Sequence, residues 1–309
     1  MREIIVGTRD SQLALWQANW VVDRLSKLNP SYSFRIQGIK TQGDNILDVA
    51  LAKIGDKGLF TKELETSLLS DEIDLAVHSM KDLPTDLPSG LAVGAVCERE
   101  YPGDVLVSPH GYTLDKLPEG AVIGTSSLRR TAQLLHYRPD LKIVNIRGNL
   151  NTRLRKMAEE NMDAIVLAFA GIHRLGLADR ITERIPMEIC LPAVGQGSVG
   201  IEIRHLDEEI MDIVETIDHR PSRIAISAER NLLKRLEGGC QVPIGAYGQV
   251  IGHEIKMQGL IASLDGQQLV RDVMSGPVNE AAKIGVKLAE SLLKTGGREI
   301  LRAVRQENC

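Results

Sequence analysis

The sequence predicts an α/β protein built from two related lobes and a smaller third part. Short apolar runs that resemble strands alternate with helical patterns up to Arg204, which favours sheets covered by helices. Three segments of the first lobe return in the same order later in the chain. Beyond residue 219, alternating strand patterns are followed by helical ones, which is typical of a small α+β domain. A chain of 309 residues is long enough for two or three domains.

The first lobe opens with a strand over 3–7, a polar turn, and a helix over Gln12–Leu28 for which Ser11 is the expected N-cap. The further elements expected are a strand over Phe34–Ile39, a helix over Thr61–Leu69 and a buried strand over Ile73–Val77. Residues 40–60 hold three glycines and three aspartates without clear periodicity, so we expect a mobile, functional loop there.

Three pairs of segments indicate that the second lobe repeats the first. VGTRDSQLALWQ at 6–17 matches IGTSSLRRTAQL at 123–134, FRIQGI at 34–39 matches LKIVNI at 141–146, and 71–79 matches 160–168. The spacing falls from 117 to 89 residues between the first and last pair, so the repeat has no short period. An insertion at 40–60 in the first lobe explains the change.

The rest of the chain predicts a helix after Asp207, a longer helix from Arg220 to a stop at Gly238 and Gly239, and a sheet followed by helices. The expected elements are strands over Ile244–Ile251, Ile255–Ser263 and Gln268–Met274, a hairpin turn at Asp265 and Gly266, and helices over Asn279–Lys294 and Arg298–Arg305.

Charge and composition point to an anionic small-molecule ligand. The net charge of −4 and an aromatic content of 3% argue against nucleic acid. Residues 121–157, however, hold eight arginines and lysines against one acid, Asp140, which suits a ligand with several carboxylates. No apolar stretch is long enough to span a membrane and no signal peptide is visible, so we expect a cytoplasmic protein.

The four cysteines, Cys97, Cys190, Cys240 and Cys309, are scattered and form no CxxC pair, so we expect free thiols and no metal site. Cys240 lies in LEGGCQVPIG, where glycines let the backbone approach something large. A catalytic cysteine needs a positioned histidine, and the sequence indicates none. An attachment point is therefore favoured over a nucleophile.

Four polar segments could carry the ligand chemistry. Gly7–Ser11, Gly124–Arg130 and Arg147–Arg153 each place a glycine turn and polar side chains at a helix start, where anions bind well. Ordinary helix capping explains any one of them, but their repetition in the two lobes favours anion binding. His78–Asp82 follows a buried strand, where open α/β sheets hold ligands.

Seven ordered segments resemble those of the hydroxymethylbilane synthase family, also called porphobilinogen deaminase. They are GTRDSQLALWQA, LAKIGDKGLFTKELE, AVHSMKDLP, GTSSLRR, IRGNLNTRL, LPAVGQG and LEGGCQVPIG. The resemblance implies a transferase of haem (tetrapyrrole) biosynthesis that joins four porphobilinogen molecules head to tail, releases ammonia, and hydrolyses off hydroxymethylbilane for uroporphyrinogen-III synthase. It also implies a monomer that makes no membrane contact.

The resemblance implies a dipyrromethane cofactor, bound through a thioether to Cys240, and Asp82 as the catalytic residue. The other residues it assigns hold carboxylates of the cofactor or substrate, or belong to the mobile loop. They are Lys81, Ser11, Thr125, Ser127, Arg129, Arg130 and Arg153 for the cofactor, Arg9, Gln17, Arg147, Arg174 and Gln196 for the substrate, and Lys53, Lys57 and Phe60 for the loop.

The fold it implies has two lobes like type II periplasmic binding proteins, with doubly wound mixed sheets, and a small α+β domain that carries the cysteine. The expected division is 1–98 with 198–216 for lobe 1, 102–194 for lobe 2 and 219–309 for the C-terminal domain. Gln12, Asp56 and Ser198 depart from the family pattern, but none is assigned to chemistry.

Two other functions remain open on the residues. A non-enzymatic two-lobed binder of a polycarboxylate would explain the repeat and the arginines, but it leaves LEGGCQVPIG without a purpose. A cysteine-dependent acyl transferase would need a histidine near Cys240 and would lose activity to thiol alkylation.

Overall fold

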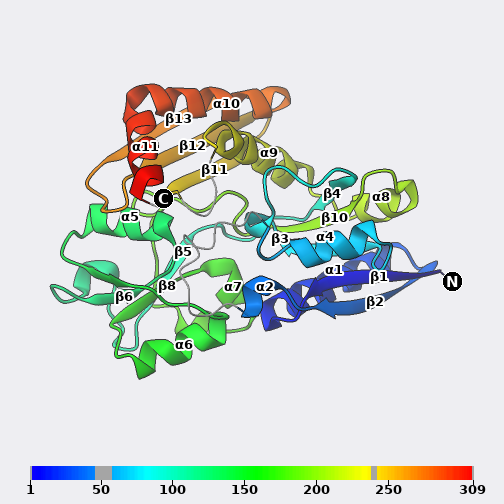
Figure 1. The fold of residues 1–309 in the computed structure, drawn as a ribbon, viewed down its shortest axis with the longest axis horizontal. Coiled ribbons are helices and arrows are strands. Elements are labelled where there is room, and N and C mark those ends of the chain that lie inside the picture. The colour runs from blue at the N-terminus through cyan, green and yellow to red at the C-terminus, as the bar shows by residue number, and fades with distance from the viewer. Residues whose placement is uncertain (1, 46–57, 238–241, 308–309) are drawn as a thin grey trace. The chain divides into compact units, whose positions relative to one another are not determined.

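The computed structural model describes residues 2–45, 58–237 and 242–307. They form two compact units (Figure 1). Unit 1 comprises 2–45, 58–100 and 197–223, and unit 2 comprises 101–196, 224–237 and 242–307. The chain therefore leaves unit 1 after Glu100 and returns to it at Gly197. Unit 2 holds both the second lobe and the C-terminal segment, so the predicted three-part division stays a prediction.

Unit 1 is built on a five-stranded mixed sheet with the order β2-β1-β3-β10-β4. β1 runs parallel to β2 and β3, whereas β10 runs antiparallel to β3 and β4. The strands are β1 (Arg2–Arg9), β2 (Tyr32–Ile39), β3 (Leu75–Ser79), β4 (Leu91–Val96) and β10 (Val199–Arg204).

Helices cover both faces of the unit 1 sheet. Alternate side chains of β1 and β3 point to opposite faces, as the period of a strand requires. One face packs against α1 and α8, for example through Val21 and Ile213, and the other packs against α4 through Leu64 and Leu68. The helices are α1 (Gln12–Leu28), α2 (Gln42–Asn45), α4 (Lys62–Leu69), α8 (Glu208–Glu215), the start of α9 (Arg220–Arg235) and the 3₁₀ turn η1 (Met80–Asp82).

Unit 2 contains a second five-stranded sheet, ordered β7-β6-β8-β5-β9. Its strands are β5 (Asp104–Val107), β6 (Val122–Gly124), β7 (Lys142–Val144), β8 (Ala164–Ala168) and β9 (Glu183–Arg184). Leu134 of α5 packs on one face, and Met157 of α6 and Ile172 of α7 pack on the other. The helices are α5 (Leu128–Tyr137), α6 (Leu150–Glu159), α7 (Phe169–Arg174) and the 3₁₀ turns η2 (Leu114–Lys116) and η3 (Ala178–Arg180).

The two five-stranded sheets confirm the internal repeat. β1, β2 and β3 take the places that β6, β7 and β8 take in unit 2, and the parallel pairs are the same. In each sheet an antiparallel strand lies beside the third, β10 in unit 1 and β5 in unit 2, and a fifth strand, β4 or β9, pairs with it at the edge. The predicted fold class, two α/β lobes with mixed sheets and a small third part, is confirmed.

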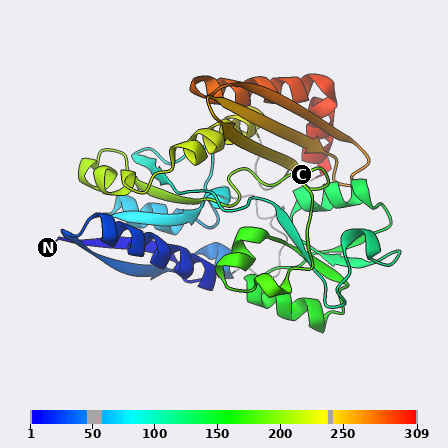
Figure 2. The ribbon, with the colours of Figure 1, turned by 180° about the vertical axis from the view of Figure 1, so that it is seen from behind.

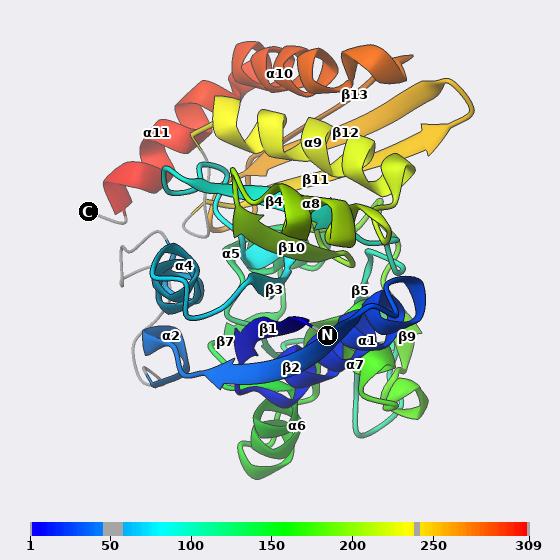
Figure 3. The same ribbon diagram turned by 90° about the vertical axis from the view of Figure 1, so that its right-hand side faces the viewer.

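The C-terminal part of unit 2 is a three-stranded antiparallel sheet of β11 (Ile244–Ile251), β12 (Glu254–Ala262) and β13 (Leu269–Pro277) (Figure 2). The unit 2 portion of α9 and the helix α10 pack on this sheet, as Figure 3 shows. Leu232 and Leu288 are two of the side chains that fill this core. The remaining elements are η4 (Val278–Glu280), α10 (Ala281–Leu292), a π-type turn (Leu293–Gly297) and α11 (Arg298–Glu307).

Most predicted elements lie within two residues of their expected bounds, and Ser11 caps α1 as expected, because its Oγ accepts a hydrogen bond from Ala14 N at 3.3 Å. The strand expected over Ile73–Val77 is displaced by two residues, since β3 runs from Leu75 to Ser79. Ile73 is buried from a turn, where its side chain packs against Leu64 and Leu68 of α4. None of the described helices is long and apolar enough to cross a membrane.

One polar cluster interrupts the core of unit 1. His78 of β3 and Glu202 of β10 lie on neighbouring antiparallel strands, with His78 Nε2 3.0 Å from Glu202 Oε2. Both side chains are almost fully buried, and the carboxyl of Glu65 on α4 is buried near them. Burial raises the pKa of the Glu65 carboxyl, and the charge of Glu202 acts in the same direction.

Replacing Glu65 with glutamine keeps a neutral side chain of similar shape at every pH. Between the unfolded pKa and the raised folded pKa, the folded wild-type protein holds a proton on Glu65 that its unfolded chain releases. Its free energy of unfolding therefore falls as the pH rises through that interval. We expect Glu65→Gln to melt close to the wild type near pH 4 and at a higher temperature than the wild type at pH 8. Circular-dichroism melts across that range measure the difference.

The matched control is Glu3→Gln, which removes an exposed carboxylate of unit 1 that pairs with Arg35 at 3.0 Å. Its melting temperature should not rise above that of the wild type at pH 8. If the difference in melting temperature between Glu65→Gln and the wild type stays constant from pH 4 to pH 8, the pKa of the Glu65 carboxyl is not raised in the folded protein.

Candidate functional site

In unit 1 the parallel pairing of β1 and β3 brings two of the predicted site residues together. Arg9 is the last residue of β1, and Asp82 ends the 3₁₀ turn η1, which follows β3 directly. Parallel strands end at the same edge of a sheet, and the Arg9 NH1 atom lies 4.0 Å from Asp82 Oδ2. The carboxylate thus has a cation at ion-pair distance and a side chain that remains 32% exposed.

Phe60 joins the same group. The Arg9 guanidinium carbon lies 4.2 Å from the centroid of the Phe60 ring, which is a cation–π contact. Phe60 also packs tightly on α2, because a Cβ atom on Gly43 would fall 2.2 Å from its ring. Of the residues predicted for the loop, Phe60 therefore sits beside Arg9.

Three further predicted residues of unit 1 have defined positions. Ser11 is the N-cap of α1, and its Oγ accepts a hydrogen bond from Ala14 N. Gln17 is buried in α1, and its Nε2 donates a hydrogen bond to Ser79 Oγ at 3.0 Å, three residues before Asp82. Lys81 is exposed within η1. Gln17 therefore holds the end of β3, where η1 begins.

Unit 2 places the hydroxyls of Thr125 and Ser127 after β6. Ser127 is the N-cap of α5, and its Oγ accepts a hydrogen bond from Arg130 N at 3.4 Å. Thr125 is buried, and its Oγ1 accepts from Ser127 N at 3.3 Å. This is a helix start with positive partial charge, as the repeated motif predicts.

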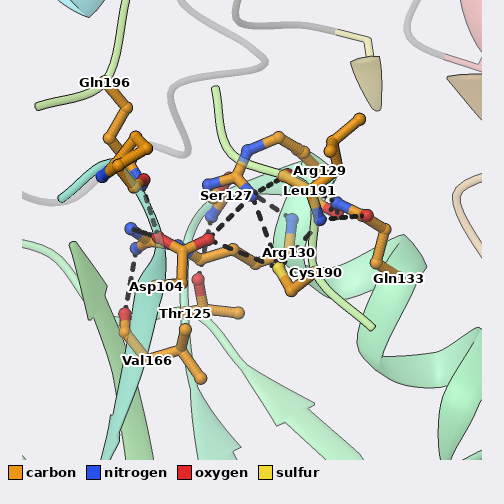
Figure 4. A network of polar contacts seen from close by, with 11 residues as sticks. Asp104, Thr125, Ser127, Arg129, Arg130, Gln133, Val166, Cys190, Leu191 and Gln196 are labelled. Atoms are coloured by element: carbon orange, nitrogen blue, oxygen red, sulfur yellow. Dashed lines mark hydrogen bonds and ion pairs between the residues drawn. The ribbon is translucent and has the colours of Figure 1, made fainter. Parts of the chain in front are cut away.

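Arg129 and Arg130 share a buried acid that was not predicted from the sequence. Both are buried, and both contact the carboxylate of Asp104, the first residue of β5 (Figure 4). Arg129 NH1 donates to Asp104 Oδ2 at 2.8 Å, and Arg130 NH2 donates to Asp104 Oδ1 at 2.7 Å. Asp104 lies outside the basic segment 121–157, so folding adds a second acid to Asp140 in this region.

The electrostatics of Asp104 follow from these two contacts. Burial by itself would raise the pKa of its carboxyl, but the charges and hydrogen bonds of Arg129 and Arg130 outweigh burial and hold the pKa well below its usual range. Cys190 lies on the same carboxylate, with its Sγ donating to Asp104 Oδ2 at 3.3 Å. Burial, assisted by the Asp104 charge, raises the pKa of the Cys190 thiol to about 12, so this cysteine stays protonated.

Gln196 completes the group around Asp104. Its Nε2 donates to Asp104 Oδ1 at 2.9 Å and to Pro102 O at 2.6 Å. Because Gln196 is the last residue of this part of unit 2 and Pro102 is near its start, the amide ties the two chain segments together. Gln196, which is predicted to bind the substrate, thus also makes contacts that hold the fold together.

The remaining predicted arginines of unit 2 follow β7 and β8. Arg147 is buried three residues after β7, and Arg153 is in the first turns of α6, where its Nε donates to Gly148 O at 2.9 Å. Gly148 has a φ of 114°, a conformation that favours glycine. Arg174 ends α7, the helix that follows β8.

Several predictions fall on residues that the structure does not describe. Lys53 and Lys57 of the loop, the departure Asp56 and the attachment residue Cys240 all lie outside the described ranges 2–45, 58–237 and 242–307. Their assigned roles stay predictions.

Two residues of these groups were missed at the level of sequence. Asp104 carries a signal that could have found it, since an acid heads the apolar run Val105–Val107 and a buried carboxylate needs a cation. Ser79 lies within the predicted segment His78–Asp82, but its contact with Gln17 joins residues 62 positions apart. No local pattern reports such a contact.

The eight cations of residues 121–157 are not all available to a ligand. Arg138 pairs with Asp140 at 2.7 Å, and Arg155 pairs with Glu159 at 2.7 Å. Arg129 and Arg130 share Asp104. Arg129 and Arg130 keep one net positive charge after Asp104 is counted, and Arg147 and Arg153 are buried and half-buried after β7. These arginines are suited to binding carboxylates.

Comparison with known proteins identifies the family. Residues 4–212 match the family model "Porphobilinogen deaminase, dipyromethane cofactor binding domain", and residues 223–294 match "Porphobilinogen deaminase, C-terminal domain". The chain is 63% identical over 306 residues to the porphobilinogen deaminase of Pelotomaculum thermopropionicum, covering 99% of this chain and 98% of that protein. It is 58% identical to that of Carboxydothermus hydrogenoformans, with the same coverage.

Among solved structures, the periplasmic VFT2 domain of Bordetella pertussis BvgS has a TM-score of 0.42 and 18% identity, with 70% of this chain and 86% of that chain covered. The two family models together span nearly all of the sequence, and the curated relatives match it from end to end. The chain therefore belongs to the porphobilinogen deaminase family and is a transferase of tetrapyrrole synthesis with a dipyrromethane cofactor.

Proposed function

We propose that the chain joins four porphobilinogen molecules head to tail on its dipyrromethane primer, releases ammonia at each addition, and frees hydroxymethylbilane by hydrolysis. Asp82 is the catalytic carboxylate in this proposal, and Cys240 carries the primer through a thioether. The observation that carries the proposal is the match of both family domains, at residues 4–212 and 223–294.

The donor set of unit 2 fits a dipyrromethane, whose two rings bear acetate and propionate side chains. The buried Nε atoms of Arg129 and Arg130 have no hydrogen-bond partner among the described residues. A buried donor without a partner costs free energy, which a ligand carboxylate would recover. The pair also keeps one net positive charge after Asp104 is counted.

The residue roles follow from the resemblance and the observed positions. Polar and cationic groups at helix starts and strand ends would hold the cofactor, and a second set would hold the incoming substrate. The cofactor set is Ser11, Lys81, Thr125, Ser127, Arg129, Arg130 and Arg153, and the substrate set is Arg9, Gln17, Arg147, Arg174 and Gln196. Lys53, Lys57 and Phe60 form the loop set in this proposal.

Asp82 has the properties that the chemical step requires. When porphobilinogen with a protonated aminomethyl group loses ammonia, the carbon–nitrogen bond breaks with its electron pair leaving on nitrogen, so the positive charge passes to the pyrrole. A carboxylate near the ring N–H stabilises this charge, which is strongest in the transition state. The new carbon–carbon bond then forms, and the attacked ring releases a proton that a carboxylate can accept.

Arg9 keeps Asp82 ready for this role. A distance of 4.0 Å between Arg9 NH1 and Asp82 Oδ2 is longer than a hydrogen bond, so the arginine lies beside the carboxylate without covering its oxygens. The contact with Phe60 orients the guanidinium in turn. When bound, the dipyrromethane supplies the pyrrole carbon that accepts the first substrate unit.

We further propose that the protein is a monomer, that it is cytoplasmic, and that its product passes to uroporphyrinogen-III synthase. The non-enzymatic binder is not favoured, because the family models include the cofactor domain and the C-terminal domain together.

The first test concerns Cys240. Intact-protein mass spectrometry of the wild type should show the added mass of two linked pyrrole units, and Cys240→Ser should lack it because oxygen replaces the attacking sulfur. Cys97→Ser, which changes a buried free cysteine of unit 1, should keep the adduct. A fully active protein without added mass would overturn the attachment.

Alkylation separates the tether from the acyl-transferase alternative. A thioether cannot form a thiolate, so treating the loaded enzyme with iodoacetamide should leave its turnover largely intact. Rapid loss of turnover that follows modification of Cys240 would favour the nucleophile instead.

The second test concerns Asp82. Asp82→Asn keeps the shape and removes the charge, so turnover should fall by about 10²- to 10⁴-fold, the usual contribution of a general acid–base group. The adduct mass should remain. Porphobilinogen consumption under saturating substrate measures the change.

The control for this test is Asp71→Asn in the same unit, where an exposed aspartate pairs with Arg204 at 3.2 Å. It should retain wild-type turnover. Normal turnover in Asp82→Asn would remove that residue from the mechanism.

A further inference from the structure

The carboxylate of Asp104 is the centre of a closed hydrogen-bond network in unit 2. Its side chain is fully buried, and each oxygen receives one guanidinium, Arg129 on Oδ2 and Arg130 on Oδ1 (Figure 4). Two neutral donors complete the shell, Cys190 Sγ on Oδ2 and Gln196 Nε2 on Oδ1. Four donors, two from α5 and two from residues 190–196, thus converge on one residue.

The rest of each guanidinium is held by backbone. Arg129 NH1 also donates to Leu191 O at 2.6 Å, and Arg130 NH1 donates to Val166 O at 2.9 Å. Because Gln133 bonds both the N–H and the C=O of Leu191, at 2.7 and 3.1 Å, that carbonyl is itself fixed in place. Each arginine is therefore held at one edge, with its Nε left without a partner among the described residues.

The carboxylate also sets the charge of the pair. Arg129 and Arg130 are consecutive, and two buried cations close together repel each other. Asp104 reduces their joint charge from +2 to +1 and is the acid that both guanidiniums contact. Without it, the two side chains would lose their shared anchor and separate toward solvent.

We propose that Asp104 is a positioning residue for the dipyrromethane site: its carboxylate aims the guanidiniums of Arg129 and Arg130 at the ligand and leaves them one net positive charge, which matches one ligand carboxylate. The inference rests on the proposed role of these two arginines in the cofactor site. Asp104 itself touches neither the cofactor nor the substrate in this proposal.

Removing the charge of Asp104 distinguishes positioning of the arginines from a pure charge effect, because the two predict opposite changes in the affinity for anionic ligands. Asp104→Asn raises the charge of the cluster to +2. If charge alone matters, anionic ligands bind more tightly. If the carboxylate positions the arginines, binding weakens although the positive charge has grown.

The test uses the full-length protein purified at a temperature well below its melting point. We expect Asp104→Asn to carry the adduct mass on a smaller fraction of chains than the wild type, and its loaded fraction to need about 10- to 100-fold more porphobilinogen for half-saturation. The kcat of the loaded fraction should change much less than KM. Intact mass spectrometry gives the first readout, and initial rates give the second.

A neutral variant keeps the proposal testable if Asp104→Asn does not fold. Cys190→Ala removes the thiol that donates to Asp104 Oδ2 without changing any charge, so it should raise KM in the same direction by a smaller factor. Cys190→Ser restores a donor and should return KM toward the wild-type value. Equal KM values in the wild type, Cys190→Ala and Cys190→Ser would overturn the proposal.

Asp74→Asn is the matched control, because Asp74 of unit 1 also lies between two arginines, at 3.1 Å from Arg2 and 3.5 Å from Arg204. It should lower the melting temperature and leave the adduct fraction and KM unchanged. If Asp104→Asn behaves in the same way, or binds porphobilinogen more tightly, Asp104 does not position the arginines. A wild-type protein without any adduct would instead overturn the proposed function.

Discussion

Parallel strand pairing determines where the polar segments of both units lie. In unit 1, β2 and β3 run parallel to β1, and in unit 2, β7 and β8 take the same places beside β6. The segments that follow these strands therefore leave each sheet at one edge, which is where open α/β sheets hold ligands. Arg9 and Asp82 lie at this edge in unit 1, and Thr125 and Arg147 follow it in unit 2.

The same architecture supports different chemistry in the two units. The unit 1 edge presents a carboxylate and an arginine at 4.0 Å, whereas the unit 2 edge presents hydroxyls and arginines. A cationic transition state calls for the first, and a polycarboxylate ligand calls for the second. Duplicated strands thus provide two scaffolds, and the loops after them supply the chemical difference.

In the proposed function, burial distinguishes the roles of Asp82 and Asp104. Asp104 is fully buried and each of its oxygens contacts an arginine, so its charge is neutralised by side chains of the fold. Asp82 is 32% exposed and has one arginine at a longer distance, so its oxygens remain open to a ligand. A carboxylate whose oxygens are all occupied by protein donors is suited to a structural role. One whose oxygens are partly unoccupied is suited to contact a reacting ligand.

The sequence by itself determined the order of the elements, the repeat and the family. These depend on local patterns, namely apolar periodicity, caps such as Ser11, and short segments such as AVHSMKDLP, which need no knowledge of distant contacts. Only the tertiary structure decided that Ile73 is buried from a turn and that Arg129 and Arg130 share Asp104. That carboxylate lies 25 and 26 positions from its two arginines, on a different element. A count of charges within one segment cannot show a partner that folding brings in from another.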